Sequence, residues 1–301
     1  MHARMSLTRL QDPLRRLRRT VWPRRRDHEW PADASAARRA FSRQLQAIVA
    51  EGVDCAPPIG LHVVCFSSEP DLPEQVASLR SFLAYAGVPE RLTIVSDGTH
   101  PPRSRQLLRA LHPSIDVLDW HSLLRADLPE ALLAYSRTGW RGKKAAVLAS
   151  LAVETPVFYT DSDVLFFPAA TELRSLEREG EPRYLRDVPE GLFLDSELLY
   201  DPREQSEGVN SGVIFLPYRL DWSPALRRLA QRRGKPAMFT GQTIAHLALH
   251  GAGAKPFAPE RYVVAIDDMD VAEDPHFGPD VVLRHYVTSV RHKFWTRVSS
   301  L

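Results

Sequence analysis

Cysteine is scarce in this sequence, and its scarcity excludes two kinds of small scaffold. The 301 residues contain only two cysteines, Cys55 and Cys65. Two cysteines build neither a disulfide framework nor the four-ligand spacing of a structural zinc site. We therefore expect the fold to rest on a hydrophobic core, which a chain of this length can bury. A reducing compartment is the corresponding expectation.

Long hydrophobic runs are also missing. The longest apolar stretch extends from Ala145 to Val153 and is interrupted by Ser150. It is much shorter than the roughly 20 residues that span a bilayer, and it indicates a buried helix instead. The N-terminus carries charge without a hydrophobic stretch of the signal-peptide type. These absences predict a cytoplasmic protein without a membrane span.

Acidic residues are scarce at one end of the chain. Residues 1–30 hold nine Arg and three acids, which leaves 30 basic and 34 acidic residues for the remainder. We therefore divide the chain into a basic segment, residues 1–35, and a single domain, residues 36–301. The body contains no second basic patch and no motif that would support nucleic-acid binding, so nucleic acid is not an expected partner.

The basic segment has the pattern of a short amphipathic helix over residues 13–26. Asp12 and Pro13 suit a helix start, and three apolar side chains then share one face: Leu14, Leu17 and Val21. Such a helix suits an anionic membrane surface, which would place the protein at the inner face of the membrane. A solvated tail or a segment docked on a partner remains the alternative.

The rest of the chain alternates strand and helix patterns. Expected strands cover residues 59–66, 92–95, 115–118, 157–159, 183–188, 208–216, 263–266 and 281–287, and a second apolar run covers residues 164–167. Expected helices cover residues 38–49 and 143–153, with others around Leu79, Leu107, Leu226 and Gly241 to Leu249. This order predicts an α/β fold with a mixed, mainly parallel sheet flanked by helices. Ligands of such sheets bind beyond the carboxyl ends of the strands, where Ser67, Asp97 and Asp161 lie.

Asp161-Ser162-Asp163 separates two apolar runs. Carboxylates in buried sequence need partners that offset their lost hydration. A divalent cation bound by oxygen ligands is one such partner for two adjacent carboxylates. An ordinary turn at the end of a strand, rich in Asp and Ser, is the competing interpretation.

Three later motifs give the chain a family resemblance. Asn210-Ser211-Gly212 is similar to the Asn-Ser-Gly strand entry that follows an Asp-x-Asp motif in family 8-like glycosyltransferases of the GT-A fold. Gly241-Gln242 resembles a helix start near the acceptor side of those enzymes, where Gln242 would act in catalysis. The segment from His285 to Trp295 resembles their C-terminal His-x-x-Gly-x-x-Lys-Pro-Trp motif, although Thr288 stands for Gly and Phe294 for Pro.

The resemblance implies a GT-A fold, a nucleotide-sugar donor and transfer with retention at the anomeric carbon. It also implies a metal site formed by Asp161, Asp163 and His285, and a contact between Lys293 and the diphosphate. Arg291 or His292 is the alternative for that contact, because the spacing after His285 is longer than in the family. Two carboxylates and an imidazole suit Mn²⁺ or Mg²⁺.

The expected chemistry assigns roles to the remaining polar residues. Loss of a diphosphate leaving group develops negative charge, which a metal ion and a cation such as Lys144 (or Lys143) would stabilise. Ser67 and Asp97 would bind the base or ribose, and Asn210, Ser211 and Gly212 would line the donor site. We expect a UDP-sugar donor and a glycan or lipid-linked acceptor. Asp187 and Asp195 are expected in a solvated loop, with contact to the sugar or the acceptor as the alternative for either.

Two other functions remain open at this point. A sugar nucleotidyltransferase would carry a glycine-rich phosphate loop after its first strand, but Ser67-Ser68-Glu69-Pro70 contains no glycine. A non-catalytic GT-A-like module that binds a partner through the basic segment is the second alternative.

Overall fold

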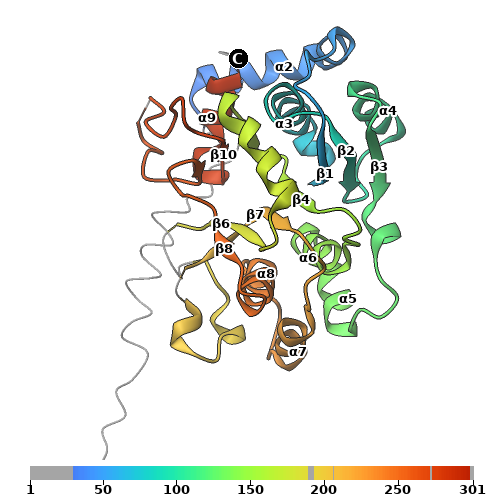
Figure 1. The fold of residues 1–301 in the computed structure, drawn as a ribbon, viewed down its shortest axis with the longest axis vertical. Coiled ribbons are helices and arrows are strands. Elements are labelled where there is room, and N and C mark those ends of the chain that lie inside the picture. Colours follow the sequence, from blue (N-terminus) through green and yellow to red (C-terminus); the bar gives the residue numbers. More distant parts are fainter. Residues whose placement is uncertain (1–29, 189–192, 206, 272, 299–301) are drawn as a thin grey trace, which may run out of the picture.

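The computed structural model describes residues 30–188, 193–205, 207–271 and 273–298 (Figure 1). The amphipathic helix predicted over residues 13–26 lies outside these ranges. The first described helix, α2, extends from Ala32 to Glu51. It begins three residues before residue 35, the predicted end of the basic segment. The division of the chain at residue 35 and the membrane contact both stay predictions.

The central sheet has seven strands in the order β3-β2-β1-β4-β7-β6-β8. Strands β3, β2, β1 and β4 are parallel, whereas β7 is antiparallel to both of its neighbours, β4 and β6. The predicted mixed, mainly parallel α/β sheet is confirmed. The strand bounds are β1 Ile59–Ser67, β2 Pro89–Ser96, β3 Ile115–Asp119, β4 Val157–Asp161, β6 Arg183–Arg186, β7 Val209–Leu216 and β8 Lys255–Pro256.

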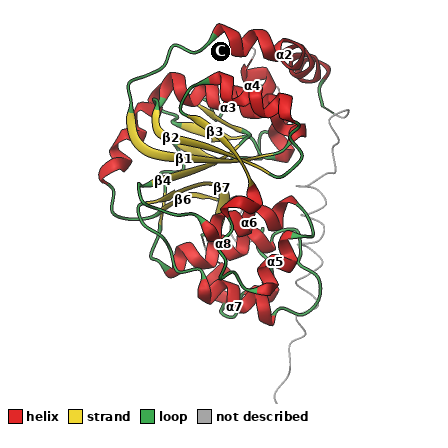
Figure 2. Cartoon of the chain, turned by 90° about the vertical axis from the view of Figure 1, so that its right-hand side faces the viewer, coloured by secondary structure: helices red, strands yellow, loops and turns green. Residues whose placement is uncertain are grey.

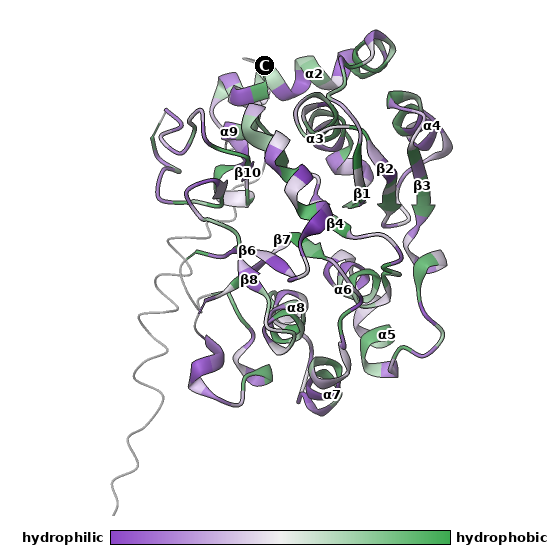
Figure 3. Cartoon of the chain, in the orientation of Figure 1, coloured by the Kyte–Doolittle hydropathy of each residue, from purple (hydrophilic) through white to green (hydrophobic). Residues whose placement is uncertain are grey.

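Helices cover both faces of this sheet (Figure 2). One face carries α2, α3 (Leu72–Tyr85) and α4 (Pro102–Leu111). The other carries α5 (Glu130–Ser136), α6 (Trp140–Ser150), α7 (Ser223–Gln231) and α8 (Thr240–Gly251). The helices mix hydrophobic and hydrophilic residues, whereas the central strands are mostly hydrophobic (Figure 3). Strands buried on both faces have this composition in parallel sheets.

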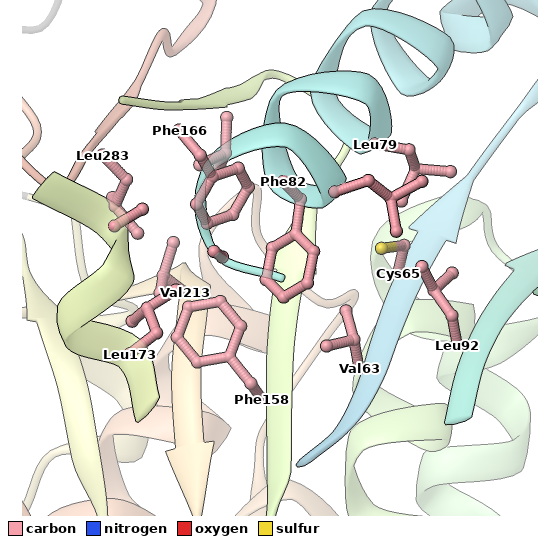
Figure 4. Packing of buried hydrophobic residues seen from close by; sticks show 14 of the residues in the cluster. Val63, Cys65, Leu79, Phe82, Leu92, Phe158, Phe166, Leu173, Val213 and Leu283 are labelled. Carbon is pink, nitrogen blue, oxygen red and sulfur yellow. The ribbon is translucent and has the colours of Figure 1, made fainter. Parts of the chain in front are cut away.

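The core divides into two layers because side chains alternate along each strand. Val63 and Cys65 of β1 pack with the cluster under α3, whereas Val64 and Phe66 pack with the cluster under α6. In the first cluster, the Phe82 ring meets the Phe166 ring edge-on, with centroids 4.9 Å apart (Figure 4). The β1 strand is therefore fixed from both sides, which positions the residues at its carboxyl end.

A second, three-stranded sheet brings the C-terminal part of the chain to the carboxyl edge of the first. Its order is β5-β10-β9, with bounds β5 Val164–Phe166, β9 Tyr262–Val263 and β10 Leu283–His285. The last helix, α9 (Arg291–Val298), packs against α2. Neither α5 nor α9 was expected from the sequence. Short 3₁₀ turns complete the described chain: η3 Glu69–Asp71, η4 Trp120–Leu123, η5 Pro168–Arg178, η6 Ser196–Leu198, η7 Pro202–Gln205 and η8 Thr288–Val290.

None of the helices in the described residues combines the length and the apolar composition that a bilayer crossing requires.

Candidate active site

A cavity of about 500 Å³ opens at the carboxyl edge of the parallel strands. Phe66 of β1 is in register with Asp161 of β4, and Ser67 with Ser96 of β2, so these strands end together. Ser67, Asp97 and Asp161 all line the cavity. The volume lies within the range of small-molecule sites in proteins. The sequence-predicted site residues found in its lining are Ser67, Asp97, Lys144, Asp161, Asp163, Asn210, Ser211, Gly212, Gln242 and His285.

Each carboxylate of the Asp161-Ser162-Asp163 motif faces a cation. Lys144 Nζ lies 2.7 Å from Asp161 Oδ2, and the Tyr159 hydroxyl donates to Asp161 Oδ1. Arg291 donates to Asp163 Oδ2, while His285 Nε2 lies 3.0 Å from Asp163 Oδ1. Burial raises the pKa of the Asp163 carboxyl, but the charges of Arg291 and His285 outweigh it and hold the pKa well below its usual range. Asp163 is therefore a buried carboxylate anion.

His285 reaches this motif through strand pairing. It is the last residue of β10, paired with Val164 of β5, which directly follows Asp163. Nε2 of His285 lies 3.9 Å from Asp161 Oδ2, and one ligand atom from each of Asp161, Asp163 and His285 falls within 4.8 Å of the others. Two neighbouring carboxylates and an imidazole from 122 residues further along the chain thus face one point.

The Asn210-Ser211-Gly212 strand entry holds this imidazole. His285 Nδ1 lies 2.9 Å from Asn210 Oδ1, which also accepts the Gly212 N–H. Because that oxygen can only accept, Nδ1 donates to it, and Nε2 is the ring nitrogen that faces Asp163. A Cβ on Gly212 would lie 2.2 Å from His285 Cε1, so the ring requires glycine there.

Asp187 was expected in a solvated loop, and that expectation is wrong. The residue is 6% exposed, directly after β6, and lines the cavity. Asn210 Nδ2 donates to its Oδ1, and Gln242 Nε2 donates to its Oδ2 at 2.8 Å. Burial raises the pKa of Asp187 to about 6 despite these hydrogen bonds. Gln242 thus meets a carboxyl group that changes charge near neutral pH.

Asp195 is also buried rather than solvated. Its carboxylate pairs with Arg232 at 2.9 Å and accepts a hydrogen bond from Thr240 at the start of α8. These contacts fix the entry to α8, the helix that carries Gln242. Asp195 therefore has a structural position behind the cavity.

Lys293 does not lie where the resemblance implied, because the terminal motif is helical. Residues two apart on a helix point to different sides. Arg291 faces the cavity, whereas Lys293 is 3% exposed and pairs with Asp268 at 2.8 Å. Of the two side chains, Arg291 therefore meets the Asp161-Ser162-Asp163 motif, which agrees with the alternative left open by the sequence.

The side of the cavity formed by Ser67, Asp97 and Thr99 is polar. The Ser67 hydroxyl is buried and has no hydrogen-bond partner within the described ranges. Asp97 Oδ1 accepts from both the backbone and the hydroxyl of Thr99, and Lys143 Nζ donates to the Asp97 carbonyl. An unpaired hydroxyl beside a cavity suits a hydrogen bond to a bound molecule.

Trp140 and Arg141 are among the cavity residues that sequence reasoning missed. Both lie in the first turn of α6, and Arg141 stands three positions before Lys144, on the same face of the helix. The sequence shows this spacing only if the helix is predicted to begin at Trp140. The sequence pattern had placed the start at Lys143.

Comparisons with known proteins give structural relatives alone. No protein-family model matches the sequence, and no curated protein matches it significantly. Among solved structures, the galactosyltransferase LgtC in complex with donor and acceptor sugar analogues is similar, with a TM-score of 0.52 and 13% identity. The match covers 79% of this chain and 95% of that one. The chain has the fold of GT-A glycosyltransferases.

Two further structures share this GT-A fold. An active-site variant of LgtC, with glutamate in place of a glutamine, has a TM-score of 0.50 at 13% identity and the same coverage. The glycosyltransferase GlyE of Streptococcus pneumoniae has a TM-score of 0.52 at 13% identity, with 80% of this chain and 60% of that one covered. At such identities the similarity establishes the fold, and the cavity must carry any argument about activity.

Proposed function

We propose that this protein is a metal-dependent glycosyltransferase that transfers a sugar from a nucleotide-diphosphate donor, UDP in the simplest case. The observation that carries the proposal is the convergence of Asp161, Asp163 and His285 at the cavity of a GT-A fold. The glycosyltransferase activity named for the structural relatives supports the same conclusion.

The residues fit a divalent metal ion. Hard carboxylate oxygens and one imidazole nitrogen suit Mn²⁺, and Mg²⁺ is the close alternative. Asn210 accepts from Nδ1 of His285, so Nε2 would be the ligand nitrogen once a metal ion took the place of its proton, which is the usual arrangement behind a histidine ligand. When bound, the ion would neutralise charge on a diphosphate leaving group.

The chain's own cations support departure of the diphosphate. Arg291 and Lys144 both line the cavity beside the two carboxylates. Fixed positive charge that already points to the leaving group requires little rearrangement during the reaction. Lys293 has no such role in this proposal, because Asp268 holds its ammonium group outside the cavity lining.

The other cavity residues divide between nucleoside and sugar. We assign the base or ribose to Ser67 and Asp97, because a free hydroxyl and a carboxylate lie together at the ends of β1 and β2. Asp187 and Gln242 form the sugar side, where a carboxyl group and an amide can orient hydroxyl groups. The active-site glutamine named for LgtC is consistent with a catalytic role for Gln242.

Finer features of the reaction rest on the family 8 resemblance. It implies retention at the anomeric carbon, which proton NMR of a fresh product would test. A glycan or lipid-linked acceptor stays our proposal, and so does contact of residues 13–26 with an anionic membrane.

Thermal unfolding with UDP tests the metal-bridged site. UDP with Mn²⁺ should raise the Tm, because a ligand at 100 times its Kd stabilises by about 2.7 kcal/mol. EDTA should abolish the effect, and so should Asp163→Ala. A Tm increase that persists in EDTA and in Asp163→Ala would disprove the metal bridge. A response to nucleoside triphosphates but not to UDP would indicate a nucleotidyltransferase, and no response to any nucleotide would indicate a binding module.

A second acidic group supplies the matched control. Asp267, Asp268 and His276 also come within ligand distance, but Asp268 is already paired with Arg284 and Lys293. Asp267 is 75% exposed at its side chain. The variant Asp267→Ala should keep the full UDP response. Electron paramagnetic resonance of Mn²⁺, measured without any nucleotide, should likewise show Mn²⁺ binding that Asp163→Ala weakens and Asp267→Ala preserves.

A further inference from the structure

One cation at the cavity has no carboxylate partner among the residues that the structure describes. Arg141 is partly buried and lines the cavity, yet within the described ranges it forms neither an ion pair nor a side-chain hydrogen bond. The other cavity cations do have partners, since Lys144 pairs with Asp161 and Arg291 with Asp163. Burial lowers the pKa of the Arg141 guanidinium, because water is removed without a countercharge to replace it. A buried charge without a partner is costly and indicates a binding role.

Trp140 holds this guanidinium in place without using its donors. Arg141 Cζ lies 4.4 Å from the centroid of the Trp140 ring, in cation–π contact. A cation–π contact engages the guanidinium without giving any of its N–H groups a hydrogen-bond acceptor. Planar, preorganised N–H groups suit the paired oxygens of a carboxylate or phosphate.

The surface around Arg141 is apolar and open. Trp140 is 48% exposed and Met238 is 47% exposed, and both line the cavity. Large exposed apolar side chains gathered at a cavity mark a binding surface more often than chance exposure does. An indole suits a sugar ring, because it offers a broad apolar face to the C–H groups.

The position of Arg141 is on the sugar side of the cavity. It lies three residues before Lys144, about 4.5 Å along the axis of α6. The start of α8 packs against the same turn, since a Cβ on Gly241 would lie 3.2 Å from the Arg141 carbonyl oxygen. Gln242 is the next residue of α8. Arg141 is therefore flanked by the residues assigned to the diphosphate and to the sugar.

We propose that Trp140 and Arg141 form a subsite for an anionic saccharide, with the sugar ring against Trp140 and its carboxylate or phosphate on Arg141. This inference rests on the proposed glycosyltransferase function and names the class of one of its sugars. The anionic group belongs to the acceptor or to the transferred sugar, two sources that share the same chemistry.

Matched pairs of sugars test the subsite. Dissociation constants are measured by saturation-transfer NMR or calorimetry in the presence of Mn²⁺. The acceptor arm compares methyl glucuronide with methyl glucoside, and glucose 6-phosphate with glucose. The donor arm compares UDP-glucuronic acid with UDP-glucose. We expect the anionic member of at least one pair to bind about tenfold more tightly, as charge-assisted hydrogen bonds allow. The arm that responds identifies the source.

Variants assign the preference to this residue. In Arg141→Gln the preference should fall to within about twofold, whereas Arg141→Lys should retain part of it. Arg137→Gln, directly after the neighbouring helix α5, is the control, because the Arg137 side chain is 66% exposed and pairs with Glu130. Trp140→Ala should weaken both members of the responding pair and, because the indole positions Arg141, should also reduce the preference for the anionic member. If Arg141→Gln does not fold, Arg141→Lys and Trp140→Ala decide the result.

Two results would overturn the subsite. One is the lack of any preference for an anionic member in every pair, including no binding at all. The other is a preference that survives Arg141→Gln unchanged. The metal-dependent UDP shift is measured separately in the same variants and should equal that of the unmodified protein. A failure of that shift would contradict the proposed function, whereas an unaltered shift without a charge preference would contradict only the subsite.

Discussion

At the scale of single residues, Gly212 creates the space that the His285 ring occupies. An added methyl group would lie 2.2 Å from His285 Cε1 and 2.8 Å from Asn210 Oδ1. Gly212→Ala should therefore push the imidazole away from Asp163 and cost about 1–3 kcal/mol of stability, as overpacking does. We expect a lower Tm and loss of the Mn²⁺-dependent response to UDP, both measured by thermal unfolding.

A second glycine separates this effect from the general cost of replacing glycine. Gly180 is exposed, and a Cβ there would meet nothing within 4 Å. Gly180→Ala should keep both the Tm and the UDP response. A normal UDP response in Gly212→Ala would show that His285 does not need this space.

At the residue scale, a motif at the end of a strand pointed to residues that the structure places at the cavity, and their roles stay predictions. Asp161, Asp163 and Asn210 stand out because polar groups interrupt apolar strands there, and the structure places them at one cavity. Asp187 and Arg141 carry no such local mark. Their importance comes from burial and from missing or distant partners, which only the folded chain creates.

At the scale of elements, β10 and α9 are held by buried ion pairs. Arg284 of β10 is fully buried, and its guanidinium contacts Asp268 at 2.9 Å as well as Asp274. Both acids lie in the long connection between β9 and β10, which also supplies Ile266 to the cavity. Arg284→Met should cost about 3–5 kcal/mol, because removing one partner leaves buried charge uncompensated. Urea unfolding measures this loss.

A more exposed ion pair provides the comparison for Arg284. Arg261 pairs with Glu172, and their side chains are 35% and 29% exposed. Solvent screens such a pair, so Arg261→Met should cost less than about 1 kcal/mol. Equal losses in the two variants would contradict a special role for the buried network.

The element α9 explains why the terminal motif was only half predicted. A motif matched position by position from Arg291 to Trp295 does not predict the helix that the chain forms there. The helical turn sends Arg291 to the cavity and Lys293 to Asp268. Tertiary contacts of α9 with α2, including the Trp295 indole that donates to Glu74, decide this geometry. Local pattern alone does not contain those contacts.

At the scale of the whole molecule, the first half was the more predictable part. Its parallel strands are buried on both faces and are separated by clear helix ends, such as Gly87, whose φ of 131° suits glycine. The second half depends on pairing at long range, since β7 inserts between β4 and β6. The strands expected over residues 263–266 and 281–287 also depend on long-range pairing. The structure has β9 at Tyr262–Val263, which shares only Val263 with the expected range, and β10 at Leu283–His285, which is shorter than expected.

Acid stability is a property of the whole molecule that one buried histidine should influence. His246 of α8 is 1% exposed, and its Nε2 contacts the Glu204 carbonyl. Burial lowers the pKa of His246 to about 4, from an ordinary value of 6.5. Above pH 6.5 the residue is neutral in both folded and unfolded chains, so its contribution to stability is fully present. As the pH falls toward 4, only the unfolded chain takes up the proton, and about 3 kcal/mol is lost.

Replacing this residue should flatten the acid side of the stability curve. His246→Gln keeps an N–H donor for the Glu204 carbonyl but does not titrate, so it should lose up to about 3 kcal/mol less than the unmodified protein between pH 7 and pH 4. Urea unfolding at several pH values measures the difference, with exposed His121→Gln as the control. Because burial of α8 imposes the low pKa, the two variants should differ only below pH 6.5. Parallel curves for His246→Gln and the unmodified protein across that range would show that His246 can take up its proton without leaving the core.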